Sequence, residues 1–379
     1  MSNSFKQKVR VGVLYGGRSS EHEVSLRSAA SVFKRLDRSK YEPHLIYIDR
    51  AGVFHWANVP ESFAQSNDPS LPEATDSPEV IFLPRPHKGA DGRFKATFQY
   101  LDPKHAGKKE EVDVLIPMLH GKNCEDGTLQ GMFDSAEVAY TGSGVIGSAI
   151  GMDKEVSKRL ADHAGIPIVP YRVARIGQDE ATLKALLADV EKSFGFPVFV
   201  KAASEGSSVG VFKVKTKEDF IPKIHEAFKY DRKVLIEKAI PAREIEFSVM
   251  ENSEPGKLPL VSIPAEIIPT HEFYTYDAKY NDENGAVFKV PAEISPELTQ
   301  TLSSMAQKIF GTLELEGYAR IDLFLDQQTN EYYLNEVNTL PGFTSISMFP
   351  KLFEKSGIPY SELLTRLIDL ALNRSKTNS

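Results

Sequence analysis

Residues 318–338 read YARIDLFLDQQTNEYYLNEVN, which is two strand-like segments joined by a short polar turn. Their Tyr, Ile, Leu, Phe and Val residues are typical of strands that bury one or both faces. The same segments also contain four charged or amide side chains, Arg320, Asp322, Glu336 and Asn338. A charge left unpaired in a buried sheet costs several kcal/mol. The stretch therefore predicts a hairpin whose polar side chains share a binding partner.

The pairing register decides whether these four side chains lie together. If Arg320 lies opposite Glu336, and Asp322 opposite residue 334, all four share one face, whereas a slip of one residue separates them. On one face, Asp322, Glu336 and Asn338 would offer three oxygen ligands, which suit a hard cation such as Mg²⁺. The alternative is a solvated sheet face with scattered ion pairs.

Length and charge limit the classes of protein to consider. A chain of 379 residues exceeds what one compact core usually serves, so about two or three domains are expected. The 45 basic and 52 acidic side chains give a net charge of -7, which argues against a nucleic acid or an anionic membrane as the main partner.

Cysteine content and hydropathy point to a cellular compartment. The single cysteine, Cys124, excludes an intramolecular disulfide and suits a reducing environment. We interpret it as a small, half-buried residue rather than a nucleophile. No apolar run resembles a signal peptide or approaches about 18 residues, so we expect a cytoplasmic protein.

The order of patterns along the chain predicts an α/β fold. Residues 9–48 form a strand, helix, strand unit that is typical of a parallel sheet. Residues 56–109 are rich in Pro, Asp, Ser and Lys, and we interpret them as an elaboration of the sheet edge or as surface loops. We expect a first domain over 1–142, a second over 143–236 and a third over 237–379.

Two further segments have the residue types of a nucleotide site. KAASEGSSVGV, residues 201–211, places backbone N–H groups and hydroxyls on one turn, as phosphate-binding loops do, and Lys201 would be its counter-charge. The alternative is a flexible hairpin loop. In LIEKAI, residues 235–240, Glu237 could bind an adenine edge, and Glu246, further along the chain, could bind a ribose. Alternatively, both are ordinary strand glutamates.

Two loops are further candidates for the functional site. HEFYTYDAKYNDENG, residues 271–285, contains four aromatic residues and is long enough to be a lid that excludes water, although a surface loop is the alternative. GGRSSEHEVS, residues 16–25, is a helix N-terminus with two glutamates that could bind an anion or cap the helix.

In order, the motifs are GGRSSEHEVSL, MLHG, EDGTLQG, GMDK, VKAASEGSSVG, LIEK, YDAKY, ARIDLFL and NEVNTLPGFTSIS. This order, from about Gly16 to Ser347, resembles the D-alanine:D-alanine ligase family of ATP-grasp enzymes. The resemblance implies an α/β (α+β) fold of three domains, in which an N-terminal parallel α/β domain precedes two ATP-grasp subdomains. Residues 56–109 fit no motif and would be a variable insertion.

The resemblance also implies the chemistry. ATP would activate the carboxylate of one D-alanine as an acyl phosphate, and the amine of a second D-alanine would attack it, supplying peptidoglycan precursors. Glu237 would hold the adenine amino group and Glu246 the ribose. The other implied nucleotide-binding residues are Lys154, Lys201, Glu205, Gly206, Ser208, Val209, Lys238, Ala239, Ile240 and Phe273.

The remaining implied roles concern metal and amino acids. Asp322, Glu336 and Asn338 would bind two Mg²⁺ ions, with Mn²⁺ as an alternative. Arg320 and the Gly342 N–H would stabilise the charge that develops in the reaction. Glu21, with His120 nearby, would bind the first ammonium group, although His120 could instead bond a loop carbonyl. Lys279 and Ser347 would meet the second carboxylate or the phosphate, and Ser207 and Tyr280 would link loop, lid and Glu21.

Rival functions stay open at this point. The resemblance implies that Tyr280 favours D-alanine as the second substrate, because relatives that make D-alanyl-D-lactate replace the matching residue. Ligation to D-serine or D-lactate is an alternative. A non-catalytic ATP-binding module is another. The family implies a homodimer.

Overall fold

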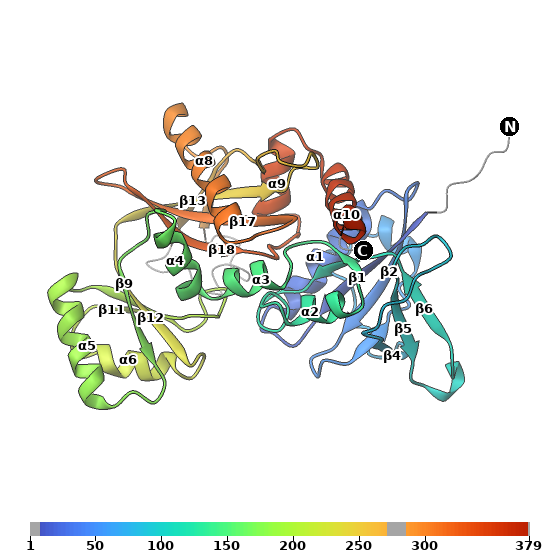
Figure 1. Ribbon diagram of the computed structural model, residues 1–379, viewed down its shortest axis with the longest axis horizontal. Coiled ribbons are helices and arrows are strands. Elements are labelled where there is room, and N and C mark those ends of the chain that lie inside the picture. Colours follow the sequence, from blue (N-terminus) through green and yellow to red (C-terminus); the bar gives the residue numbers. More distant parts are fainter. Residues whose placement is uncertain (1–7, 271–285, 378–379) are drawn as a thin grey trace.

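The computed structural model describes residues 8–270 and 286–377, which form three sheets with helices packed against them (Figure 1). The sheets follow one another along the sequence: an eight-stranded sheet ends at Tyr140, a four-stranded sheet covers 171–238 and a six-stranded sheet covers 242–338. The α/β class predicted from the sequence is therefore confirmed. Among the described residues, no helix is both long and apolar enough to cross a membrane.

The first sheet is parallel at its centre, as the opening strand, helix, strand pattern predicts. Its order is β6-β5-β4-β3-β2-β1-β7-β8, and β1 pairs in parallel with both β2 and β7. Helix α1 (His22–Arg35) packs on one face and α2 (Thr128–Ser135) on the other. The strands are β1 (Val9–Gly16), β2 (Tyr41–Ile48), β3 (Phe54–Trp56), β4 (Glu79–Phe82), β5 (Ala96–Tyr100), β6 (Lys109–Val112), β7 (Val114–Met118) and β8 (Ala139–Tyr140).

Residues 56–109 extend the edge of this sheet. They contain β4 and β5, which pair antiparallel in the series β3, β4, β5, β6, and the short 3-10 helices η1 (Glu61–Gln65) and η2 (Pro103–His105). Phe82 and Phe98 are buried, and the ring of Phe82 packs against both Phe98 and Phe133 of α2. The stretch is thus an elaboration of the sheet edge, and the alternative of surface loops alone is wrong.

The second sheet is antiparallel, with the order β11-β10-β12-β9. Helices α5 (Glu180–Ser193) and α6 (Phe220–Ala227) share an apolar core with it. In Figure 1 this unit, coloured green to yellow, projects away from the rest. Its strands are β9 (Tyr171–Arg175), β10 (Val198–Ala202), β11 (Val211–Val214) and β12 (Lys233–Lys238).

The third sheet has one apolar face and one polar face. Ile245, Phe247 and Ile321 pack against α8 (Pro296–Thr312), whereas the residues between them point to the opposite side, because side chains alternate along a strand. The order is β16-β15-β13-β17-β18, with β14 paired to β13. The strands are β13 (Ala242–Met250), β14 (Leu260–Val261), β15 (Ala265–Pro269), β16 (Ala286–Lys289), β17 (Tyr318–Asp326) and β18 (Tyr332–Asn338).

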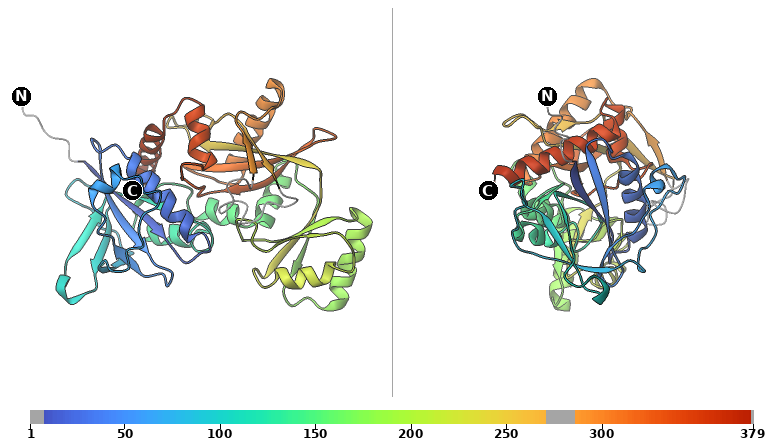
Figure 2. Two further views of the ribbon diagram at one scale, coloured as in Figure 1. Left: turned by 180° about the vertical axis from the view of Figure 1, so that it is seen from behind. Right: turned by 90° about the vertical axis from the view of Figure 1, so that its right-hand side faces the viewer.

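The first and third sheets share an apolar core. Residues of α9 (Met348–Lys355) and α10 (Tyr360–Thr377) pack in the same cluster as Val11 and Val13 of β1. The view from behind agrees, with α10 lying against the first sheet while the second sheet stands at the far end (Figure 2). The second sheet is therefore the unit that shares least apolar core with the other two.

Helices α3 (Val145–Met152) and α4 (Lys154–His163) connect the first sheet to the second. Although they lie within the predicted second domain, Ala161 of α4 and Ile150 of α3 pack into the core of the third sheet. The limits of the three domains stay a prediction.

The hairpin of residues 318–338 pairs in a register that brings its polar side chains together. Arg320 lies opposite Asn338 and Asp322 opposite Glu336, so all four share one face. The predicted parity is correct, but the predicted pairs are wrong by two residues. A β-bulge follows Asp322, where the partner of Leu323 is Leu334. The bulge adds one residue to β18 and so changes the direction of its side chains.

Candidate active site

The polar face of the third sheet forms part of the wall of two adjoining cavities. The first, which we call the Arg320 cavity, has a volume of about 140 Å³. The second, the Lys201 cavity, has a volume of about 250 Å³ and lies between the second and third sheets. Glu336 and Ile267 line both cavities, so the two meet at β18 and β15.

The predicted site residues divide between the two cavities. A larger cavity of about 660 Å³, between α2, α3 and α10, contains none of them. The Arg320 cavity is lined by Glu21, His120, Gly206, Ser207, Glu246, Arg320, Glu336, Asn338, Gly342 and Ser347. The Lys201 cavity is lined by Lys154, Lys201, Glu205, Ser208, Glu237, Lys238, Ile240 and Glu336.

A buried lysine, Lys158, and a half-buried one, Lys201, hold Glu237 in the wall of the Lys201 cavity. Lys201 Nζ lies 2.5 Å from Glu237 Oε2, and Lys158 Nζ lies 2.9 Å from Glu237 Oε1. Burial alone would raise the pKa of Glu237, but the positive charges of Lys158 and Lys201 lower it to about 2. Glu237 is therefore an ionised carboxylate at neutral pH.

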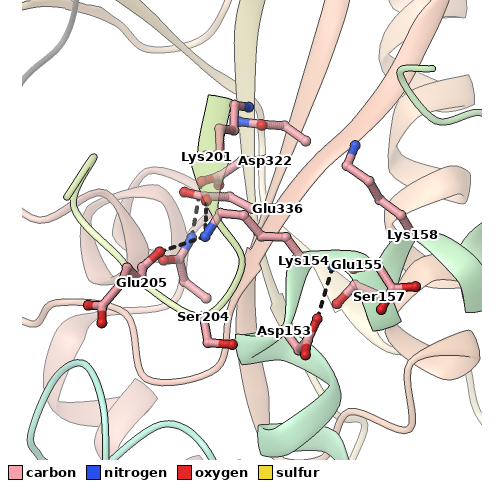
Figure 3. A network of polar contacts seen from close by, with 12 residues as sticks. Asp153, Lys154, Glu155, Ser157, Lys158, Lys201, Ser204, Glu205, Asp322 and Glu336 are labelled. Carbon is pink, nitrogen blue, oxygen red and sulfur yellow. Dashed lines mark hydrogen bonds and ion pairs between the residues drawn. The ribbon is translucent and has the colours of Figure 1, made fainter. Parts of the chain in front are cut away.

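Lys154 connects the loop of residues 204–210 to the hairpin of residues 318–338. Its Nζ donates a 2.7 Å hydrogen bond to the Glu205 carbonyl oxygen and lies 3.4 Å from Glu336 Oε2 (Figure 3). Asp153 caps the N-terminus of α4 by accepting hydrogen bonds from the Glu155 and Val156 N–H groups. This cap fixes the position of Lys154, the first residue of the helix. The helix cap thus places a cation at the meeting point of the two cavities.

The loop of residues 204–210 covers both cavities. Glu205 and Ser208 line one cavity, while Gly206 and Ser207 line the other. Its base is held by the Ser204 N–H, which donates a 2.7 Å hydrogen bond to Asp231 Oδ2. These contacts speak against the alternative of a plain hairpin loop.

Arg320 is a half-buried cation in the wall of the Arg320 cavity. It donates to both carboxylate oxygens of Asp322, at 2.8 and 2.7 Å, and lies 3.4 Å from Glu246 Oε1. Asn338 Nδ2 donates a 3.1 Å hydrogen bond to Asp322. Burial lowers the pKa of Arg320, but the charges of Asp322 and Glu246 raise it well above its ordinary value. Because Asp322 is 1% exposed, the alternative of a solvated sheet face is wrong.

Glu21 and His120 line the opposite end of the Arg320 cavity. Glu21 is the N-cap residue of α1, but its Oε1 accepts a 2.6 Å hydrogen bond from Ser207 rather than capping the helix. His120 Nδ1 lies 3.0 Å from the Leu340 carbonyl oxygen, so the contact with a loop carbonyl is present in addition to the cavity lining. Burial lowers the pKa of His120, but Glu125 and Glu21 raise it above its usual value.

One predicted pairing of residues is wrong. Glu246 does not line the Lys201 cavity with Glu237, but lies beside Arg320 in the other cavity. Glu244, on the same face of β13 and one alternation earlier, lines the Lys201 cavity instead. The residue types and their alternation were readable from the sequence, but the position along the strand at which the second sheet meets β13 was not.

Other predicted residues fall outside the cavity walls or the described ranges. Asp322, Ala239 and Val209 line neither cavity. Phe273, Lys279 and Tyr280, with the predicted lid, lie outside the described residues.

Besides Glu244, sequence reasoning missed three residues. Lys158 lies one helical turn after Lys154 in DKEVSK, a spacing that could have indicated it. Glu125 lies in the EDG motif, half-buried, with its Oε1 3.7 Å from His120 Nδ1. Asn335 is the extra residue of the β18 bulge and donates a 3.2 Å hydrogen bond to Glu244, both in the wall of the Lys201 cavity. No local pattern signals such a bulge.

Comparison with known families covers nearly the whole chain. Residues 10–143 match the family described as "D-ala D-ala ligase N-terminus", and residues 160–369 match "D-ala D-ala ligase C-terminus". The chain is 47% identical over 373 residues to D-alanine–D-alanine ligase A of Bradyrhizobium diazoefficiens, covering 97% of this chain and 96% of that protein. It is 41% identical to D-alanine–D-alanine ligase A of Escherichia coli, with 97% of each covered.

Solved structures share the fold. The D-alanine–D-alanine ligase of Coxiella burnetii superimposes with a TM-score of 0.81 at 32% identity, covering 98% of this chain and 96% of that one. The VanG D-Ala:D-Ser ligase of Enterococcus faecalis also gives a TM-score of 0.81, at 30% identity, covering 96% of this chain and 100% of that one. These matches confirm the predicted three-domain ATP-grasp fold. The chain belongs to the D-alanine–D-alanine ligase family, whose members are enzymes that use ATP and a divalent metal.

Proposed function

We propose that this protein joins two D-alanines into D-alanyl-D-alanine, with hydrolysis of ATP to ADP and phosphate, for peptidoglycan precursor synthesis. The observation that carries the proposal is the meeting of the two cavities at Glu336. One cavity has the half-buried lysines Lys154 and Lys201, which suit a nucleotide, and the other has a carboxylate and an arginine that suit amino acids. A phosphoryl group can pass between them only where they meet.

ATP would occupy the Lys201 cavity. Lys154 and Lys201 are the cations available for its phosphates, and the backbone of residues 204–210 adds N–H donors. Phe199 and Phe324 offer apolar surface to the base. Glu237 would accept from the adenine amino group.

The ribose would lie next to Glu244, not Glu246. This assignment replaces the role that the motif comparison implies for Glu246, because only Glu244 lines the cavity that contains Glu237. The Asn335 amide, which donates to Glu244 Oε1, would fix the direction of that carboxylate.

Asp322, Glu336 and Asn338 fit a magnesium site. They offer oxygen atoms from two paired strands, and carboxylate and amide oxygens are the ligands that Mg²⁺ prefers. Glu336 lines both cavities and Asn338 lines the Arg320 cavity, whereas Asp322 is buried beside them on the paired strand. When bound, two Mg²⁺ ions, or Mn²⁺ in their place, would neutralise phosphate charge. In this structure, Arg320 and Asn338 hold Asp322, so metal binding would share or replace these contacts.

The amino acids would occupy the Arg320 cavity. Glu21 would bind the ammonium group of the first D-alanine and turn its carboxylate toward Glu336. A carboxylate oxygen would attack the γ-phosphorus of ATP, releasing ADP and forming an acyl phosphate. The amine of the second D-alanine would then attack the carbonyl carbon, lose a proton and displace phosphate.

Arg320 and the Gly342 N–H would stabilise the oxyanions of both steps, and a preorganised donor of this kind is worth roughly 3 to 4 kcal/mol. Gly342 has close neighbours, since a Cβ there would lie 2.8 Å from Ser347 Oγ. A glycine therefore lets the backbone approach the reacting atoms. Positioning by these groups would provide much of the rate enhancement.

The choice of D-alanine as the second substrate rests on Tyr280, which lies outside the described residues. The name of the Enterococcus faecalis relative gives D-serine as its second substrate, so D-serine is the competitor to test. A homodimer and a cytoplasmic location, where ATP is made available, complete the proposal.

The deciding experiment measures phosphate release from Mg-ATP with D-alanine, L-alanine, or D-alanine plus excess D-serine or D-lactate, with mass spectrometry of the products. D-alanyl-D-alanine formed from D-alanine alone is the expected result. A mixed product would leave the reaction class in place but overturn the substrate choice. Tight ATP binding without turnover on any amino acid would favour a nucleotide-binding module instead.

A further inference from the structure

Lys158 of α4 is a buried cation that the proposed reaction does not use. It is 1% exposed and is not among the residues that line either cavity, so it does not meet substrate. Its Nζ lies 2.9 Å from Glu237 Oε1 and 3.4 Å from the Leu334 carbonyl oxygen. It also lies over the ring of Tyr171, 6.0 Å from the ring centre.

These contacts place Lys158 at the junction of two sheets. Glu237 belongs to β12 of the second sheet, whereas Leu334 belongs to β18 of the third. Burying an ammonium group is costly, and an apolar side chain of similar length would usually be at least as stabilising. The position of Lys158 therefore points to a role in the site rather than to stability alone.

Lys158 and Lys201 together fix the orientation and the ionisation of the Glu237 carboxylate. Each carboxylate oxygen is held by one ammonium group, so the carboxylate can neither rotate nor be protonated without losing an ion pair. Each oxygen still has a second lone pair with which to accept from another donor. Glu237 therefore faces the Lys201 cavity as an acceptor that cannot donate.

An acceptor of this kind distinguishes purine bases. Adenine has an amino group at position 6, which can donate to Glu237, whereas hypoxanthine and guanine have a carbonyl oxygen there. A carbonyl oxygen against a fixed carboxylate leaves two acceptors facing each other without a proton between them.

We propose that Lys158 is a positioning residue for nucleotide choice, which makes the cavity select adenine over 6-oxo purines by keeping Glu237 a fixed acceptor. The inference rests on the proposed function, because it requires ATP in the Lys201 cavity. If Lys158 is removed, Lys201 is the one ion-pair partner of Glu237 that remains among the described residues. Its free oxygen can then rotate or take up a proton and donate to a carbonyl oxygen.

The test compares ATP with inosine triphosphate, which has a 6-carbonyl, in wild type, Lys158→Met and Lys158→Arg. We expect Lys158→Met to reduce the ratio of kcat/KM values, ATP over inosine triphosphate, by about 10-fold or more, through KM rather than kcat. Lys158→Arg, which keeps the charge, should restore part of the preference. Lys308→Met removes an exposed lysine that bonds the Ala164 carbonyl oxygen at the other end of α4, and serves as the matched control with an unchanged ratio.

Equal loss for both nucleotides in Lys158→Met, or no change in the ratio, would overturn the inference. If Lys158→Met does not fold, Glu237→Gln gives a second test, because an amide can both donate and accept and should lower the same ratio. An unchanged ratio in Glu237→Gln would also overturn it. Equilibrium binding of ADP and inosine diphosphate, without amino acids, separates this inference from the reaction. Selective ADP binding by a wild-type protein that makes no dipeptide would refute the proposed function alone.

Discussion

Ser207 Oγ donates a 2.6 Å hydrogen bond to Glu21 Oε1, although 186 positions separate the two residues in the sequence. Glu21 begins the first helix of the first sheet, and Ser207 belongs to the loop between β10 and β11 of the second. Ser207 has a φ of 51°, in the left-handed region that few serines adopt. The contact therefore joins the loop of residues 204–210, which lines both cavities, to a carboxylate in the wall of the Arg320 cavity.

Ser207→Ala is expected to weaken the use of D-alanine more than the use of ATP. Losing a hydrogen bond to a carboxylate costs about 1.5 to 3 kcal/mol, which corresponds to a decrease in kcat/KM for D-alanine of about 10- to 100-fold. Steady-state kinetics with each substrate varied in turn would measure it. Ser135→Ala, which removes a serine that bonds only within the α2 region, is the control. Unchanged D-alanine kinetics would show that the contact has no role in binding.

Glu336→Gln is expected to raise the Mg²⁺ concentration needed for half-maximal activity and to lower kcat. Groups that hold or orient metal ligands typically contribute about 10- to 100-fold in metal affinity or activity. The measurement is phosphate release during a Mg²⁺ titration after treatment with a chelator. Glu331→Gln, an exposed acid in the turn of the same hairpin, should behave as wild type. An identical titration curve for Glu336→Gln would refute the metal site.

Glu244→Gln and Glu246→Gln are expected to affect different kinetic constants. Because Glu244 lines the Lys201 cavity, where ATP is proposed to bind, Glu244→Gln should raise KM for ATP by about 10-fold. Glu246 lies 3.4 Å from Arg320, so its change should lower kcat while leaving KM for ATP nearly constant. Each variant is the control for the other. The reverse pattern would restore the ribose role to Glu246.

Cys124 is expected to be unreactive in the folded protein. It is 8% exposed, buried rather than half-buried as predicted, and burial, with the charges of Glu125 and Asp126, raises the pKa of its thiol to about 12. At pH 8 its reaction with a disulfide reagent should be about 1000-fold slower than that of free cysteine, because only the thiolate attacks. Adding guanidinium should release one reactive thiol. Fast reaction without denaturant would contradict the buried position.

The hairpin of residues 318–338 shows how far local pattern extends. Alternation of apolar and polar residues predicts that Arg320, Asp322, Glu336 and Asn338 share a face, and they do. The exact partners differ by two residues, because pairs shifted by two have the same parity and the same faces. The bulge that turns Asn335 toward Glu244 depends on how the strands pack, and no local pattern indicates it.

Glu246 and Lys158 show where local pattern stops. Glu244 and Glu246 both point to the polar face of β13, and only the position of the second sheet decides which one meets Glu237. The spacing of Lys158 from Lys154 places both on one helix face, but no local pattern indicates that Glu237, far along the chain, lies 2.9 Å from Lys158.

The sequence by itself determined the strands and helices, the polar face of the hairpin, the loops that suit phosphates and the family, because these depend on residue type at short spacing. The tertiary structure alone decided that the three sheets converge on two cavities meeting at Glu336, and which carboxylates enter each. The physical reason is that these side chains come from strands far apart in sequence. Their distances are set by the packing of α4, α9 and α10 between sheets, and no local pattern contains that information.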